Sequence, residues 1–112
     1  MKNLLTITLI IFSFTALSQP FNYNFKKETL RVDYLHSGNS EEEEYELVEF
    51  VEEPHWGGSE TILEDPFDYG NYKVEMRYLS TNELLYSRGY SSLFREWQAT
   101  DEAKTKTRSF YE

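Results

Sequence analysis

The 112-residue chain contains no cysteine, so neither a disulfide framework nor a catalytic thiol can be built from it. Glycine and proline are sparse, at 5 and 3 residues, and no glycine-rich phosphate-binding loop is present. Lys and Arg are missing from residues 32 to 72, although twelve of the 20 acidic residues lie between Glu41 and Asp68. A domain with these absences has to be held together by packing alone.

The charge balance excludes one class of partner. The chain carries 11 basic and 20 acidic side chains, a formal net charge of −9. Such a field repels polyanions, so we expect no nucleic-acid partner. The acidic run that begins at Glu41–Glu44 has two interpretations, a solvated loop that keeps the protein in solution or a surface that binds cations.

The first residues have the pattern of a cleavable secretory signal peptide. Lys2 supplies a positive start, Leu4–Phe14 form an apolar segment, and small residues then suit cleavage between Ser18 and Gln19. An apolar segment of about 11 residues is roughly 16 Å of helix, too short for a hydrocarbon core of ~30 Å. The alternative is a short membrane anchor that is retained. We therefore expect a periplasmic, cell-surface or secreted protein with no membrane contact after cleavage, and one domain over residues 19–112.

Aromatic residues are abundant and predict a β-structure. The chain has 9 Tyr, 8 Phe and 2 Trp, side chains that favour strands and bury large areas when packed. Apolar and polar residues alternate over residues 29–35 and, less regularly, over 45–51, which predicts two strands. They alternate again over residues 72–78 and 84–89, and these two segments are predicted to pair as a hairpin. The second segment is expected to place on one face Tyr45, Leu47, Glu49 and Val51, and on the other Glu46, Val48 and Phe50. We interpret the aromatic residues as core, with a carbohydrate-binding platform as the alternative.

The pattern becomes helical near residues 91–104. The spacing of one inward-packing helical turn occurs at Leu93, Phe94 and Trp97. Thr100 is expected to cap a further short helix, and alternation over residues 105–111 predicts a last strand. That strand ends on exposed aromatic residues, so we interpret the chain as truncated, with one sheet edge unpaired. The predicted fold is mainly β, an incomplete antiparallel β-sandwich-like domain with one short helix.

Residues that carry catalysis or bind metals are poorly represented. The two histidines, His36 and His55, are too far apart for a zinc-peptidase helix, and the serines lack a nucleophile elbow. No calcium-loop spacing occurs, and adjacent carboxylates on a strand point to opposite faces. His55 lies near Glu52 and Glu53, where the alternatives are a weak surface metal site and an ordinary loop histidine. We therefore predict no catalytic residue, no metal site and no cofactor in this chain.

Three stretches together resemble a known family. They are Thr29–Tyr34 with the turn Ser37–Asn39, the turn Pro54–Trp56 with its following glycines, and Tyr90–Trp97 with Thr100–Ala103. Over residues 25–110 the chain is similar to the N-terminal domain of the IgA peptidase family of bacterial zinc metallopeptidases. The resemblance implies a β-sandwich-like accessory module, with zinc held by a His-Glu-x-x-His helix of a separate catalytic domain that is missing here.

The resemblance favours one function and leaves another open. We expect a non-catalytic accessory module whose partners are the catalytic domain and a protein or glycoprotein substrate. The candidate contact residues are Trp56, Tyr90, Phe94 and Trp97, and the alternative is that these four side chains fill the core or an interdomain seam. The second hypothesis is a stand-alone secreted protein that binds a glycan or a cationic partner.

Overall fold

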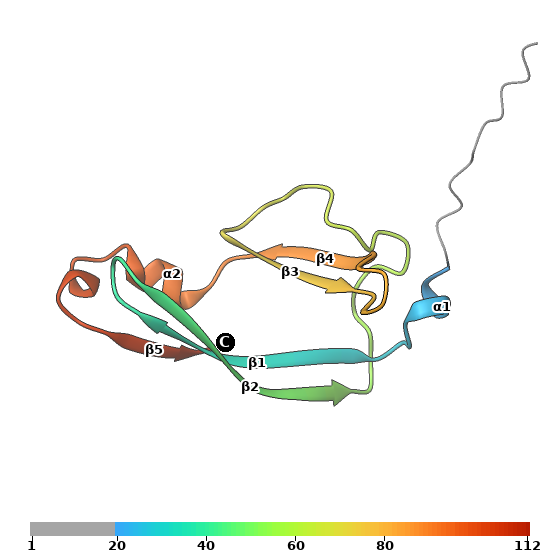
Figure 1. Ribbon diagram of the computed structural model, residues 1–112, viewed down its shortest axis with the longest axis horizontal. Helices are drawn as coiled ribbons and strands as arrows, with labels where there is room; N and C mark the ends of the chain where they lie inside the picture. Colours follow the sequence, from blue (N-terminus) through green and yellow to red (C-terminus); the bar gives the residue numbers. More distant parts are fainter. Residues whose placement is uncertain (1–19) are drawn as a thin grey trace, which may run out of the picture.

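The computed structural model describes residues 20–112, so the predicted signal peptide and its cleavage site between Ser18 and Gln19 lie outside the described residues. The predicted mainly β class is confirmed, with five strands in two antiparallel sheets of order β2-β1-β5 and β3-β4. In chain order the elements are α1 (Phe21–Asn24), β1 (Thr29–Gly38), β2 (Glu43–Glu53), β3 (Tyr72–Arg77), β4 (Leu84–Tyr90), α2 (Leu93–Gln98), the 3-10 helix η1 (Glu102–Lys104) and β5 (Arg108–Tyr111) (Figure 1).

The first hairpin is longer than the sequence pattern predicts. β1 runs on through Gly38, and the chain reverses over Asn39 to Glu42. Asn39 holds this turn twice, since its N–H donates to the Glu42 carbonyl at 2.9 Å and its Oδ1 accepts from the N–H groups of Glu41 and Glu42 at 2.9 and 3.0 Å. Asn favours turns because its side chain bonds to the backbone in this way. His36, placed after the end of the predicted strand, is therefore a strand residue.

A β-bulge explains the irregular pattern of β2. Asp33 pairs with Glu49 whereas Tyr34 pairs with Leu47, so Val48 is an extra residue. One extra residue shifts the alternation by one position. Phe50 therefore lies on the same face as Tyr45 and Leu47, and the expectation that it shares a face with Val48 and Glu46 is wrong.

The second hairpin forms as predicted. β3 and β4 pair antiparallel from Tyr72 opposite Tyr90 to Arg77 opposite Leu84. In the connecting loop the Asn82 N–H donates to the Tyr78 carbonyl at 2.7 Å, and Asn82 adopts a φ of 60°. Asn tolerates this left-handed conformation better than most residues.

The helical segment forms the core of the described chain. Ser92 caps α2 by accepting from the Arg95 N–H at 3.1 Å, as serine commonly does at this position. Phe94 and Trp97 then turn inward, and Ala103 and Phe110 pack with them. Thr100 does not cap η1 as predicted, because its hydroxyl donates backwards to the Trp97 carbonyl at 2.6 Å.

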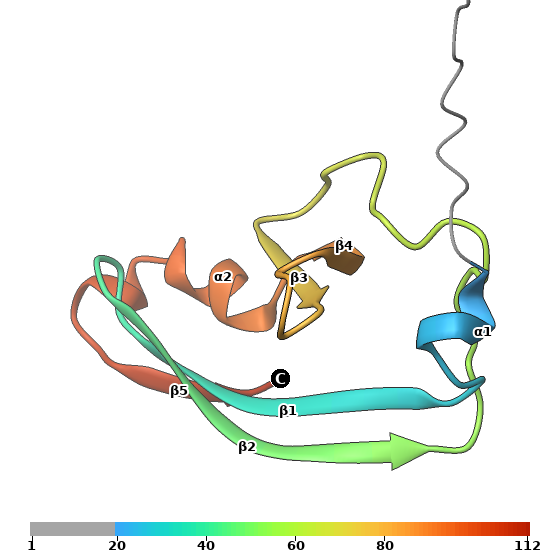
Figure 2. The same ribbon diagram turned by 45° about the vertical axis from the view of Figure 1, so that its right-hand side comes forward.

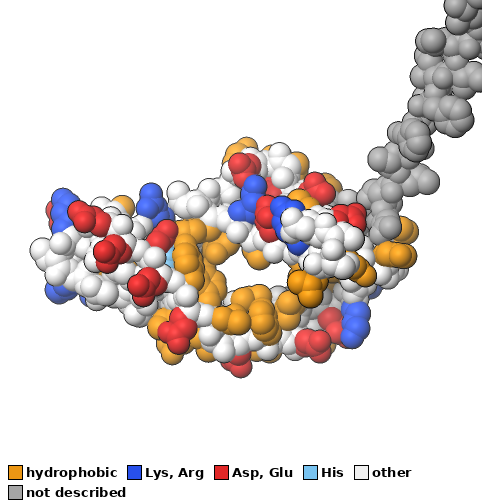
Figure 3. All heavy atoms as spheres, viewed as in Figure 1, with side chains coloured by type: hydrophobic (Ala, Val, Ile, Leu, Met, Phe, Trp, Pro, Cys, Tyr) orange, Lys and Arg blue, Asp and Glu red, His pale blue; other side chains and the backbone are white. Residues whose placement is uncertain are grey.

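The two sheets lie one above the other without closing. In both ribbon views the β3–β4 hairpin stands over the curved β1–β2 hairpin, with α2 at one end of the long sheet and α1 at the other (Figures 1 and 2). Hydrophobic side chains border an opening between the sheets (Figure 3). Within residues 20–112 no helix is long and apolar enough to cross a membrane.

Candidate functional site

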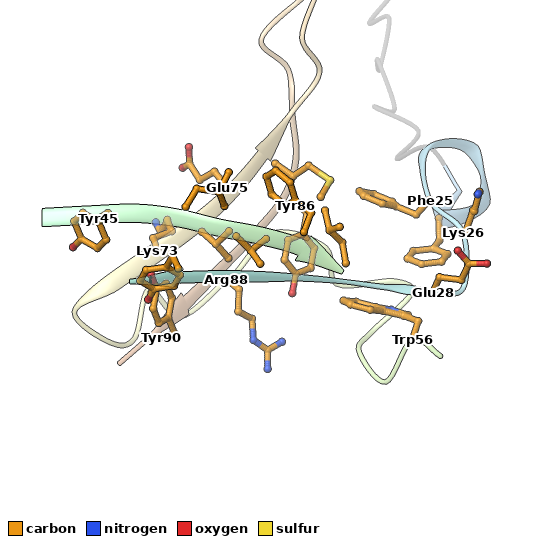
Figure 4. A pocket seen from close by; sticks show the side chains of 18 residues that line it. Phe25, Lys26, Glu28, Tyr45, Trp56, Lys73, Glu75, Tyr86, Arg88 and Tyr90 are labelled. Carbon is orange, nitrogen blue, oxygen red and sulfur yellow. Dashed lines mark hydrogen bonds between the residues drawn. The ribbon is translucent and has the colours of Figure 1, made fainter. Parts of the chain in front are cut away.

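The opening between the sheets is an apolar groove of about 860 Å³. Its walls come from the facing sides of β1, β2, β3 and β4, and α1 closes one end (Figures 3 and 4). Several apolar side chains that line it are much more exposed than those of a closed sandwich core, at 61% for Phe50, 55% for Leu47, 47% for Leu30 and 43% for Val74. The groove is therefore an open and mainly apolar surface, with charged residues such as Lys73, Glu75 and Arg88 also among its lining.

Aromatic rings form the end of the groove beside α1. Trp56 stacks on Phe21 with ring centroids 6.2 Å apart and meets the edge of Tyr86 at 5.9 Å. Its indole N–H donates to the Ser59 carbonyl at 3.2 Å, which fixes the ring. A Cβ on Gly58 would collide with this ring, so the glycine permits the indole to fold over the loop. The result is a rigid aromatic platform that faces the groove.

A hydrogen-bonded cluster around His36 lies at the opposite end. The imidazole is fully buried between the rings of Phe94 and Tyr45, with centroid distances of 3.9 and 4.4 Å. Its Nδ1 contacts Glu112 Oε2 at 2.9 Å and its Nε2 contacts Glu43 Oε2 at 3.0 Å. Each ring nitrogen thus has a carboxylate partner, and the two contacts fix the orientation of the ring.

Three further donors, two of them tyrosine hydroxyls, complete this cluster. Glu112 also accepts from the Tyr34 hydroxyl at 2.8 Å and from the Phe94 N–H at 3.0 Å, and Glu43 accepts from the Tyr72 hydroxyl at 2.9 Å. Burial alone would raise the pKa of each carboxyl, but these hydrogen bonds and those from His36 lower the pKa of both below its ordinary value. Burial, followed by the hydrogen bonds to Tyr90 and Glu112, raises the pKa of Tyr34.

The geometry of the cluster suits a structural role. It joins β1, β2 and β3 to the end of β5, and the exposed fraction of the His36 side chain is 0%. A reacting group has to touch its substrate, which this imidazole cannot do. Among residues 20–112 no three His, Cys, Asp or Glu side chains are grouped so that they could hold a metal ion.

The four predicted contact residues do not form one patch. Phe94 and Trp97 lie in the core, with exposed fractions of 0% and 8%. Trp56 and Tyr90 both line the groove, and they belong respectively to the loop after β2 and the end of β4 (Figure 4). Phe94 and Trp97 are therefore core residues. For Trp56 and Tyr90, contact with another domain or with a substrate stays a prediction. The exposed His55 contributes its carbonyl, which accepts from the Thr29 hydroxyl.

Sequence reasoning missed the residues that organise the polar end. Alternation of Leu30, Val32 and Tyr34 continues to His36, which could have placed His36 on the inner face of the sheet. Glu43 gave no such signal, because it lies in the acidic run Glu41–Glu44. Glu112 gave none, because it contacts His36 from a position 76 residues away.

Comparison with known protein families gives a match over all the residues that the structure describes. A family model described as "Peptidase M64 N-terminus" matches residues 20–112, the same residues that form the two sheets and the groove. No curated protein matches the chain.

Proposed function

Because the chain belongs to the peptidase M64 N-terminus family, we propose that residues 20–112 are a non-catalytic module of a secreted zinc metallopeptidase, with the groove as its contact surface. The module would bind a polypeptide there, either the catalytic domain that it positions or the protein substrate. It is an N-terminal module of an IgA peptidase M64 family protein. Zinc would belong to the catalytic domain, and export would depend on the signal peptide predicted over residues 1–18.

The groove is the observation that supports this proposal. It combines apolar walls from both sheets with the aromatic platform around Trp56. Large exposed apolar surfaces in a folded protein mark sites of interaction, and aromatic anchors dominate the energy of such contacts. The imidazole of His36, in contrast, is fully buried, and the cluster around it would supply rigidity.

A charge placed in the groove tests the proposal. Leu47→Arg and Val74→Arg each put a cation on a wall whose side chain is about half exposed, so the fold should tolerate them. In the whole M64 protein we expect each to lower peptidase activity on a protein substrate at least tenfold, because a charge would be buried in the contact. Leu79→Arg is the control, since Leu79 is fully exposed outside the groove.

Activity that is equal in all three variants and in the parent protein would overturn the contact role. Zinc removal by a chelator should abolish activity of the whole protein without changing the urea unfolding of this chain. A shift of that unfolding curve by the chelator would contradict the assignment of zinc to the catalytic domain.

A further inference from the structure

One ring of the aromatic platform comes from α1. Phe21 stacks on Trp56 with ring centroids 6.2 Å apart and an interplanar angle of 22°, and on Phe25 at 5.4 Å. Both separations lie within the range that aromatic pairs favour. The exposed fraction of Phe21 is 8%, whereas Trp56 and Tyr86 reach the platform from the loop after β2 and from β4. The platform therefore already holds an aromatic side chain that a separate segment of the chain supplies.

α1 is a short helix that depends on this ring. It has four residues, Phe21–Asn24, and Pro20 at its N-cap makes no side-chain capping bond. A helix of about one turn is unstable in water without packing, and the residue that α1 buries is Phe21. Tyr23, on the same helix, is 71% exposed. The position of α1 therefore depends on where the ring of Phe21 is seated.

A second contact joins the segment after α1 to the loop that carries Trp56. Lys27 Nζ lies 3.0 Å from Glu60 Oε1, and the two side chains are 66% and 45% exposed, so this ion pair contributes little to stability. Phe25 and Trp56 lie at the same end of the groove (Figure 4). Residues 20–28, which we call the strap, precede β1. The strap can therefore leave the groove without breaking a strand pair.

We propose that Phe21 is an internal ligand of the platform, seated where an aromatic side chain of the bound polypeptide sits, and that the strap has to leave before that side chain enters. This inference rests on the proposed function and names the chemistry that the aromatic end of the groove recognises. The seated ring of Phe21 supports it, because a subsite that stacks one aromatic side chain suits another of similar shape. The strap and the polypeptide then compete for Trp56, and the strap lowers the apparent affinity of the groove.

A fluorescent peptide with the sequence of residues 20–25 tests the proposal by fluorescence anisotropy on the purified chain. Phe21→Ala empties the subsite, so we expect this variant to bind the peptide about tenfold more tightly than the parent chain does, as for a subsite that the strap fills about nine-tenths of the time. Tyr23→Ala is the matched control on the same helix and should bind like the parent chain. A peptide in which alanine replaces both phenylalanines should not bind. Equal binding of the first peptide to all three chains, or binding to none of them, would overturn the proposal.

A second variant keeps the test valid if Phe21→Ala fails to fold. Lys27→Glu places two carboxylates where the exposed ion pair with Glu60 now lies, so it loosens the strap and leaves every aromatic ring in place. We expect it to bind the peptide about threefold more tightly than the parent chain does, which is the change that one exposed ion pair allows. Lys104→Glu breaks a comparable exposed pair with Asp101 outside the groove and is the control. Equal affinities of these two variants would overturn the proposal.

Peptidase activity of the whole M64 protein distinguishes a displaceable strap from a fixed wall of the groove. Phe21→Ala should lower KM for a protein substrate and leave kcat unchanged, because the strap competes with binding alone, and Tyr23→Ala should change neither. A KM that is unchanged or higher in Phe21→Ala would overturn the proposal. If no chain binds the peptide but Leu47→Arg and Val74→Arg still lower activity, the proposed function stands and the internal ligand falls. If those two variants leave activity unchanged but Phe21→Ala binds the peptide, the proposed function falls and the aromatic subsite stands.

Discussion

Glu112→Gln should destabilise the protein by an amount that depends on pH. The carboxylate of Glu112, whose side chain is 10% exposed, accepts from three donors on Tyr34, His36 and Phe94. Glutamine has nearly the same shape but offers one acceptor oxygen and one NH₂ group. Turned to keep the oxygen toward Tyr34 and His36, it leaves the Phe94 N–H facing another donor and removes the negative charge of the carboxylate.

The cost follows from those lost partners. A buried donor without an acceptor costs about 1–3 kcal/mol, and hydrogen bonds to charged groups lie in the upper part of that range. We therefore expect the free energy of unfolding to fall by about 2–3 kcal/mol at pH 7, a large share of the 5–15 kcal/mol of a typical domain. Urea unfolding followed by Trp fluorescence measures it, since Trp97 packs against Phe94 with ring centroids 5.7 Å apart.

The pH dependence has a defined sign. The pKa of Glu112 is lowered in the folded state from the ordinary 4.5, so its contribution is fully present well above that value and is lost as the pH falls through the lowered pKa. The difference between the parent protein and Glu112→Gln should be largest at neutral pH and should shrink below about pH 4. Glu46→Gln, at an exposed position of β2, is the control. A constant difference from pH 7 to pH 3, or none at pH 7, would refute the role of this carboxylate.

Three further substitutions test other parts of the fold by urea unfolding. Phe94→Ala should lower the free energy of unfolding by about 3–5 kcal/mol, because Phe94 is fully buried. Phe50→Ala in the open groove should lower it much less, and a similar loss in both variants would show that the groove is closed in solution. Gly38→Ala should destabilise strongly, since Gly38 has a φ of 151° and an added Cβ would collide with the Glu42 carbonyl, while Gly57→Ala meets no atom within 4 Å and should be neutral. Asp65→Asn should lower the urea midpoint at pH 7, because Asp65 accepts from two backbone N–H groups at 3.0 and 2.7 Å that lower its pKa below 3.8. The difference in midpoint between this variant and the parent protein should shrink as the pH falls below that value. A difference that persists at pH 2 would contradict the role of the Asp65 carboxylate.

Sequence periodicity predicts the strands well where each has one buried face. The hairpin of β3 and β4 follows from the alternation of Tyr72, Val74 and Met76, because a period of two is the physical signature of a pleated strand. The same rule fails at Val48, because the bulge only makes the alternation over residues 45–51 less regular, and pairing with the neighbouring strand decides which residue is the extra one.

The candidate site could be predicted only in part. Trp56 and Tyr90 stand out as aromatic residues beside turns, and both line the groove. The groove itself could not be predicted, because it depends on how far apart the two sheets stand. The cluster around His36 could not be predicted either, because it depends on side chains that meet across 76 residues of sequence.

The pairing of β5 with β1 has a consequence for the order of folding. β1 with β2 and β3 with β4 are local hairpins, whereas β5 returns to β1 across more than 70 residues, as the contact of Ser37 with Ser109 shows. Contacts between distant residues can form only after a long loop has closed. Closing that loop costs conformational entropy before the contacts offset it, so such contacts slow folding. The His36 cluster needs β1, β2, β3 and β5 together, so its last hydrogen bonds form only after that loop has closed. Until then Phe110 is not packed against Phe94 and Trp97, so these apolar side chains stay exposed to association with other chains. The rate of this one closure governs how long the nascent protein is prone to aggregate in this way.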